Sequence, residues 1–102
     1  MSIAIGQYTF EGPYDKTASL QDHSGIYAIL CYRDSKYVVI DLGESAKVKE
    51  RVENHDRKDC WKKNCTGTLM VAAYYTPNLQ SSGRVLIEQE LRAQYNPACG
   101  ER

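Results

Sequence analysis

Two short β-rich runs joined by a four-residue polar link constrain the fold of this 102-residue chain more than any other feature. Residues 26–32 and 37–42 are rich in β-branched and aromatic side chains, which favour strands. The link, Arg33-Asp-Ser-Lys36, is short and polar, as hairpin loops are. The sequence therefore predicts two neighbouring antiparallel strands.

A helix is predicted over residues 46–56. Val48, Val52 and His55 recur there at helical spacing, with charged side chains between them. Ser45 stands just before this segment and is a plausible N-cap, because its hydroxyl can accept a backbone hydrogen bond.

The remaining segments complete an α+β fold. Residues 1–23 alternate and then carry glycine and proline turn signals, which predicts a short strand and a loop. Residues 56–66 are polar and predict a loop, whereas 68–75 are almost continuously apolar and predict a central strand. A closing helix is expected over 81–95, before Asn-Pro. We expect a small three-stranded, mainly antiparallel sheet flanked by helices, with an extra N-terminal strand or arm.

Length and composition indicate one globular domain. Hydrophobic residues make up 42% and charged residues 25% of the chain, which is ordinary for globular proteins. Thirteen basic residues balance thirteen acidic ones, so the net charge does not favour general attraction to nucleic acid. Seven basic residues do cluster within 47–63, which leaves room for a local basic patch.

The chain lacks an apolar run long enough for a membrane span and a basic-then-apolar leader, so a cytoplasmic location is predicted. Its four cysteines are irregularly spaced, and we expect mostly buried thiols. A zinc site made by His55, Cys60 and Cys65, with Cys99 as a fourth ligand, is an alternative.

Over residues 24–100 the chain resembles the GIY-YIG nuclease superfamily. The resemblance rests on order: Gly25-Ile-Tyr27 in the first strand, a glycine turn after the second, Arg51 on the next helix, then a strand and a helix with Glu88. The triplet alone is a weak signal, and the ordered set is a stronger one. It implies a GIY-YIG-like core, with residues 1–23 as an N-terminal extension.

The resemblance also implies roles for individual residues. By this resemblance Tyr27 would lie against the attacking water, Arg51 would face the phosphate, and Glu88 would bind one divalent ion, Mg²⁺ or Mn²⁺. Glu88 is chosen over Glu90 because residues 84–97 follow the superfamily's order of arginine, glutamate, leucine and proline. His55 follows Arg51 at the Arg-x-x-x-His spacing of some members and would assist proton transfer.

The chemistry of these residue types agrees with the implied roles. A phosphodiester is anionic, and its hydrolysis needs charge neutralisation and a positioned water. Glu88 could hold Mg²⁺, which binds through one or two carboxylates and otherwise waters and phosphate oxygens. Arg51 can clamp a phosphate with two hydrogen bonds. Tyr27 is a poor base unless nearby cations stabilise its phenolate.

Two positions depart from the superfamily's pattern. Asp41 stands where the second motif has a tyrosine, two residues before its glycine. This aspartate could be a second metal ligand or the base, or it could repel the scissile phosphate. Gly100 stands near the place where many members have an asparagine, so that amide is missing.

Each candidate also has a purely structural interpretation. Tyr27 could be an ordinary core tyrosine of a strand. Glu88 lies midway between Arg84 and Arg92, each four residues away, and could be the middle of a surface salt-bridge ladder. Arg51 could be a solvated helix charge paired with a neighbouring glutamate.

The sequence therefore predicts an endonuclease-like, divalent-metal-dependent phosphodiesterase with Tyr27, Arg51, His55 and Asp41 as catalytic candidates. We expect a nucleic-acid substrate, DNA in preference to RNA, and no membrane partner. Substrate choice would come from a protein partner, a homo-oligomer or the 56–66 loop, where Trp61 could stack on a base or anchor the loop to the core. The alternative is a catalytically eroded module that binds nucleic acid or protein without cleavage.

Overall fold

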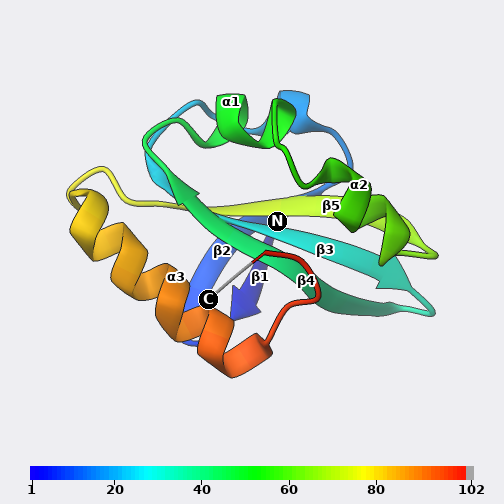
Figure 1. The fold of residues 1–102 in the computed structure, drawn as a ribbon. Helices are drawn as coiled ribbons and strands as arrows, with labels where there is room; N and C mark the ends of the chain where they lie inside the picture. The colour runs from blue at the N-terminus through cyan, green and yellow to red at the C-terminus, as the bar shows by residue number, and fades with distance from the viewer. Residues whose placement is uncertain (101–102) are drawn as a thin grey trace.

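The computed structural model describes residues 1–100, which form one antiparallel five-stranded sheet in the spatial order β1-β2-β5-β3-β4 (Figure 1). The strands are β1 (Ser2–Ile5), β2 (Tyr8–Tyr14), β3 (Gly25–Arg33), β4 (Lys36–Ser45) and β5 (Thr68–Tyr75). The α+β class is confirmed, and β5 is the central strand as predicted.

The prediction of three strands was wrong, because the N-terminal segment supplies two strands that extend the sheet beyond β5. In β2 the register shifts between Glu11 and Tyr14, around Gly12-Pro13. Proline has no N–H to donate to a ladder, so it is tolerated at such an irregularity. The same Gly-Pro pair indicates a turn when only the sequence is read, and this is why the second half of β2 was missed.

The β3–β4 hairpin is confirmed, with strands longer than predicted. Only Asp34 and Ser35 lie between the strands, and both have positive φ, at 54° and 63°. Two-residue hairpin loops favour this backbone because its twist matches that of the strands. A register shift after Ile29 leaves Ile40 between the paired residues Val39 and Asp41.

Helices cover both faces of the sheet (Figure 1). On one face lie the 3-10 helix η1 (Thr17–Ser19), α1 (Val48–Glu53) and α2 (Lys58–Lys63), and on the other lies α3 (Ser81–Tyr95). A hydrophobic core fills each interface, one containing Val48, Val52 and Trp61, the other Leu91. Among residues 1–100, no helix is long and apolar enough to span a membrane.

The segment between β4 and β5 differs from its prediction. The helix expected over 46–56 is shorter, and the loop expected over 56–66 contains α2. Ser45 does not cap α1: its hydroxyl accepts the Lys47 N–H at 2.9 Å, ahead of the helix. Trp61 is the one buried side chain of α2. A single buried residue gives no helical periodicity of apolar side chains, so this helix was not predicted.

The prediction of free cysteine thiols was also wrong. Cys31 is bonded to Cys65, and Cys60 to Cys99, which leaves no free cysteine. The partners are 34 and 39 residues apart, and the fold, not their spacing, brings them together. With these sulfurs paired, the zinc alternative is contradicted. The cytoplasmic location stays a prediction.

Candidate active site

Tyr27 and His55 form a buried hydrogen-bonded pair at the centre of the candidate site. Tyr27 lies on β3 and faces α1, with its hydroxyl oxygen 2.6 Å from His55 Nε2. The backbone N–H of Arg57 donates to His55 Nδ1 at 3.0 Å. A neutral imidazole that accepts at Nδ1 carries its proton on Nε2. His55 therefore donates to the Tyr27 oxygen, and the hydroxyl proton of Tyr27 can be donated elsewhere.

The site holds both of these groups in their neutral forms at neutral pH. Burial in the first place, together with the charges of Arg51 and Arg57, lowers the pKa of His55 to about 4. Burial raises the pKa of Tyr27 to about 12, against the same two cations, which favour the phenolate. The charges of Asp41 and Glu88 raise it slightly, so all the predicted site residues act on Tyr27.

The glycine of the second motif is required by Tyr27. Gly43 on β4 lies directly opposite Tyr27 in the β3–β4 register. A Cβ atom at Gly43 would overlap the hydroxyl end of the Tyr27 ring. The absence of a side chain at this position therefore lets the phenol lie flat across β4 and reach His55.

Asp41 is a completely buried carboxylate that binds two arginines. Its Oδ2 accepts from Arg57 Nε at 2.9 Å and from Trp61 Nε1 at 2.7 Å. Its Oδ1 accepts from the Leu42 N–H at 2.8 Å, from Arg57 Nη2 at 3.3 Å and from Arg92 Nη2 at 2.6 Å. A carboxylate has about four lone-pair positions, and five donors saturate them. Asp41 is therefore engaged as an anchor, with no lone pair left for a metal ion.

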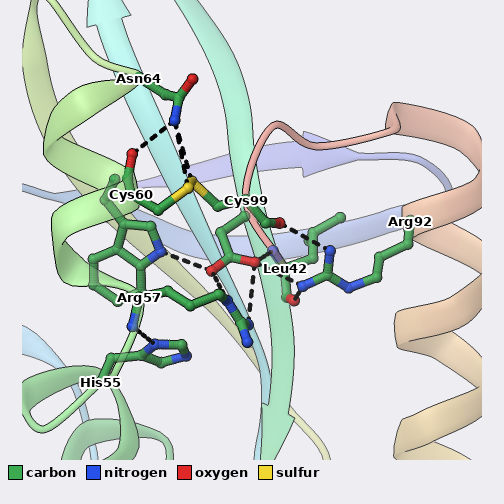
Figure 2. The surroundings of a disulfide bond; sticks show 9 residues. Leu42, His55, Arg57, Cys60, Asn64, Arg92 and Cys99 are labelled. Atoms are coloured by element: carbon green, nitrogen blue, oxygen red, sulfur yellow. Dashed lines mark hydrogen bonds and ion pairs between the residues drawn. A yellow bond between two sulfur atoms is a disulfide. The ribbon is translucent and has the colours of Figure 1, made fainter. Parts of the chain in front are cut away.

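Arg92 connects Asp41 to the predicted metal ligand. Its guanidinium reaches from α3 to the edge of β4, where it meets the C-terminal segment at Cys99 (Figure 2). It donates to the backbone oxygens of Leu42 and Cys99, and through Nε to Glu88 Oε2 at 3.1 Å. Arg92 is 2% exposed, so its positive charge is buried between two carboxylates.

Gly100 belongs to the same arrangement. Its φ is +88°, and a Cβ there would overlap the guanidinium of Arg92. The position where an asparagine was expected therefore packs directly on Arg92. The salt-bridge ladder considered for Glu88 is only half formed. Glu88 pairs with Arg92, whereas Arg84 pairs with Glu44 at 2.9 Å.

Arg51 lies at the exposed side of the site. Its Nη2 pairs with Asp56 Oδ1 at 3.1 Å, and its side chain is 38% exposed. Arg51 is thus paired with a nearby acidic residue, as its structural interpretation predicted. The partner is Asp56, however, and not Glu50 or Glu53. The Asp56 pKa is lowered, first by a hydrogen bond from its own backbone N–H and also by Arg51.

Sequence reasoning missed three side chains of this site: Arg57, Trp61 as the donor to Asp41, and Arg92 as its second cation. Arg57 and Trp61 fall in the segment predicted as a loop, and Arg92 was considered only as a surface charge. A buried aspartate in a strand was the available signal, because a charge in such a place needs partners.

Glu88 is the one acidic candidate for a metal that keeps solvent contact, with its side chain 21% exposed. Within residues 1–100, no three His, Cys, Asp or Glu side chains are grouped to hold a metal ion. Mg²⁺ commonly binds through a single carboxylate plus waters and substrate phosphate oxygens. This donor set therefore fits a hard divalent ion that arrives with substrate, and does not fit an all-protein cage.

No protein-family model and no curated protein matches the chain. Among solved structures, it is similar to the GIY-YIG N-terminal endonuclease domain of UvrC from Thermotoga maritima, a point mutant bound to its catalytic divalent cation. The TM-score is 0.60 at 12% sequence identity, covering 84% of this chain and 91% of that domain. The chain therefore has a GIY-YIG-like fold.

Proposed function

We propose that the chain is a divalent-metal-dependent phosphodiester hydrolase that acts on nucleic acid. The observation that carries this proposal is the buried Tyr27–His55 hydrogen bond on a nuclease-like fold, close enough to Arg51 and Arg57 for their charges to lower the Tyr27 pKa. A core tyrosine with a structural role alone does not need a histidine donor and two cations around its hydroxyl.

In this proposal Tyr27 first gives up its hydroxyl proton to solvent, and the resulting phenolate then takes a proton from the attacking water. A phenolate keeps the hydrogen bond from His55 Nε2–H, and hydrogen bonds to a charged form favour that form. The charges of Arg51 and Arg57 also favour the phenolate, because they lower the pKa of Tyr27. Asp41 contributes indirectly, because it fixes the guanidinium of Arg57 through two hydrogen bonds.

Arg51 binds the scissile phosphate by exchanging partners. Its present partner, Asp56, has a side chain that is 72% exposed, and such surface ion pairs contribute only about 0–1 kcal/mol. A phosphate can accept two parallel hydrogen bonds from the same guanidinium. Because Tyr27 is 1% exposed, this exchange must also open a path to its hydroxyl.

Glu88 is the residue that would hold the divalent ion. A bound ion would neutralise the phosphate and stabilise the leaving oxygen. Arg92 keeps the carboxylate of Glu88 in place through its Nε, and is itself fixed by Asp41. Asp41 thus holds Arg92, and Arg92 in turn holds the carboxylate of Glu88, the single proposed metal ligand.

The test is cleavage of branched, single-stranded and duplex DNA and RNA with Mg²⁺, with Mn²⁺ and with chelator. Wild type should cleave at least one substrate when metal is present, DNA better than RNA. Glu88→Gln and Tyr27→Phe should each lose at least about a hundredfold in rate.

Glu90→Gln is the matched control, because Glu90 lies on the same helix and its carboxylate binds Gln7 and Tyr8 instead. This variant should keep wild-type cleavage. Equal cleavage by wild type, Glu88→Gln and Tyr27→Phe would show a contaminating nuclease and reject the proposal. Binding without cleavage in every metal would also reject it.

A further inference from the structure

A cavity of about 250 Å³ lies beside the candidate active site and shares Trp61 with it. One edge of the Trp61 indole belongs to the site, where its Nε1 donates to Asp41 and its ring lies 4.7 Å from the His55 ring. The cavity opens between β2, the segment that follows it, and α2. Its floor is formed by apolar side chains of the sheet, including Ile29 and Val71.

The walls combine aromatic and charged groups. Tyr14 and the accessible edge of the largely buried Trp61 provide the aromatic surface, and Lys58 and Lys62 lie along the side formed by α2. These lysines are four residues apart, so they share one face of the helix. Lys58 Nζ donates to the backbone oxygen of Glu53, whereas Lys62 is exposed to solvent.

We propose that this cavity binds one unpaired nucleobase of the nucleic acid, with the adjoining phosphate held by Lys58 and Lys62; the proposal rests on the function proposed above. The flat base would contact the aromatic side of the cavity, and its phosphate would pair with the two lysines. Aromatic side chains bind bases by stacking without selecting their sequence.

The size of the cavity restricts the ligand to a single base. Pockets for drug-sized ligands measure about 300–1,000 Å³, and this cavity is smaller. A base pair or a folded peptide segment does not fit in it. Asp15 and Thr17 also line the cavity. The carboxylate of Asp15 can accept from the exocyclic amino group of adenine, which makes adenosine 5′-monophosphate a suitable probe.

Because the chain has one tryptophan, its fluorescence reports on this cavity, and its single indole N–H resonance reports on the neighbouring hydrogen bond to Asp41. Adenosine 5′-monophosphate is titrated in chelator, where no metal-dependent cleavage takes place. We expect a saturable change of the Trp61 signals, a weaker one with adenosine, and none with ribose 5-phosphate.

Lys62→Glu should weaken binding of adenosine 5′-monophosphate at least about fivefold at low salt, because it reverses a charge beside the phosphate. Lys63→Glu is the matched control: Lys63 is the next residue of α2, is also exposed, and does not line the cavity. It should bind as wild type does. Equal effects of the two variants, an unchanged Trp61 signal, or an equal response to ribose 5-phosphate would overturn the proposal.

The outcome is separable from that of the nuclease proposal. Binding is measured without metal and repeated in Glu88→Gln, which should retain it. A Trp61 response in a protein that cleaves nothing would reject the hydrolase and keep the nucleotide site. Cleavage by a protein without any Trp61 response would reject the nucleotide site and keep the hydrolase.

Discussion

The hydroxyl oxygen of Tyr27 lies 2.6 Å from Nε2 of His55, and both side chains are buried between the sheet and α1. The pair depends on a neutral imidazole, because the Arg57 N–H occupies Nδ1 and two arginines lie nearby. Protonation of His55 would put a third positive charge there and remove the acceptor at Nδ1. The stability of the fold should therefore depend on pH through this histidine.

His55 should make the free energy of unfolding fall between pH 6.5 and about 4. The folded-state pKa is about 4 and the unfolded value is about 6.5, so the unfolded chain binds an extra proton in this window. The stabilisation is complete above pH 6.5 and is lost as the pH falls, by roughly 1–3 kcal/mol. Urea unfolding at pH 7, 5.5 and 4.5 measures it.

His55→Gln should flatten this part of the pH profile, and His23→Gln, a substitution at an exposed histidine, serves as the control. Carboxylates also titrate in this range, and the comparison of the two variants removes their contribution. The same slope in wild type and His55→Gln would contradict the prediction.

Gly43→Ala should destabilise the protein and displace Tyr27, because the new methyl group would overlap the phenol end of its ring. Overpacking of this kind costs about 1–3 kcal/mol. Gly83→Ala in α3 should instead stabilise by about 0.5–1 kcal/mol, since its Cβ meets Leu79 at 3.4 Å and alanine favours helices. Thermal unfolding compares the two, and equal melting temperatures would show that Tyr27 does not need Gly43.

Reduction should destabilise the native state by about 2–4 kcal/mol for each disulfide. Peptide mapping without reductant should recover Cys31 linked to Cys65, and Cys60 linked to Cys99. The double variant Cys60→Ser/Cys99→Ser should loosen the C-terminal segment while its Cys31–Cys65 bond remains. Four alkylatable thiols in protein purified without reductant would contradict this pairing.

The sequence predicts those parts of this fold that depend on local patterns. The β3–β4 hairpin, the central position of β5 and the bounds of α3 each follow from short-range periodicity or from Asn-Pro after the helix. In contrast, β2 depends on pairing with β5, some 60 positions away, and the disulfides depend on the packed fold.

The same distinction applies to the site. The order of Tyr27, Arg51 and Glu88 along the chain is visible before folding. The partners of Asp41 are not visible, because Arg57 and Arg92 approach it from opposite ends of the site, one from the start of α2 and one from α3. Charges that meet only through tertiary packing leave no spacing signal.

Asp41→Asn should lower the free energy of unfolding by about 3 kcal/mol, because it leaves the buried Arg92 and the half-buried Arg57 without their shared negative charge. Asp41→Tyr, which places a tyrosine where the sequence resemblance led us to expect one, should cost at least as much, since a neutral phenol supplies no negative charge to the two guanidinium groups. Asp34→Asn, with an 83% exposed side chain, should change stability by less than about 0.5 kcal/mol. Urea unfolding of the three variants measures these differences. If Asp41→Asn were as stable as Asp34→Asn, the two arginines would not need the carboxylate, and Asp41 would be free for the catalytic role that its saturated geometry argues against.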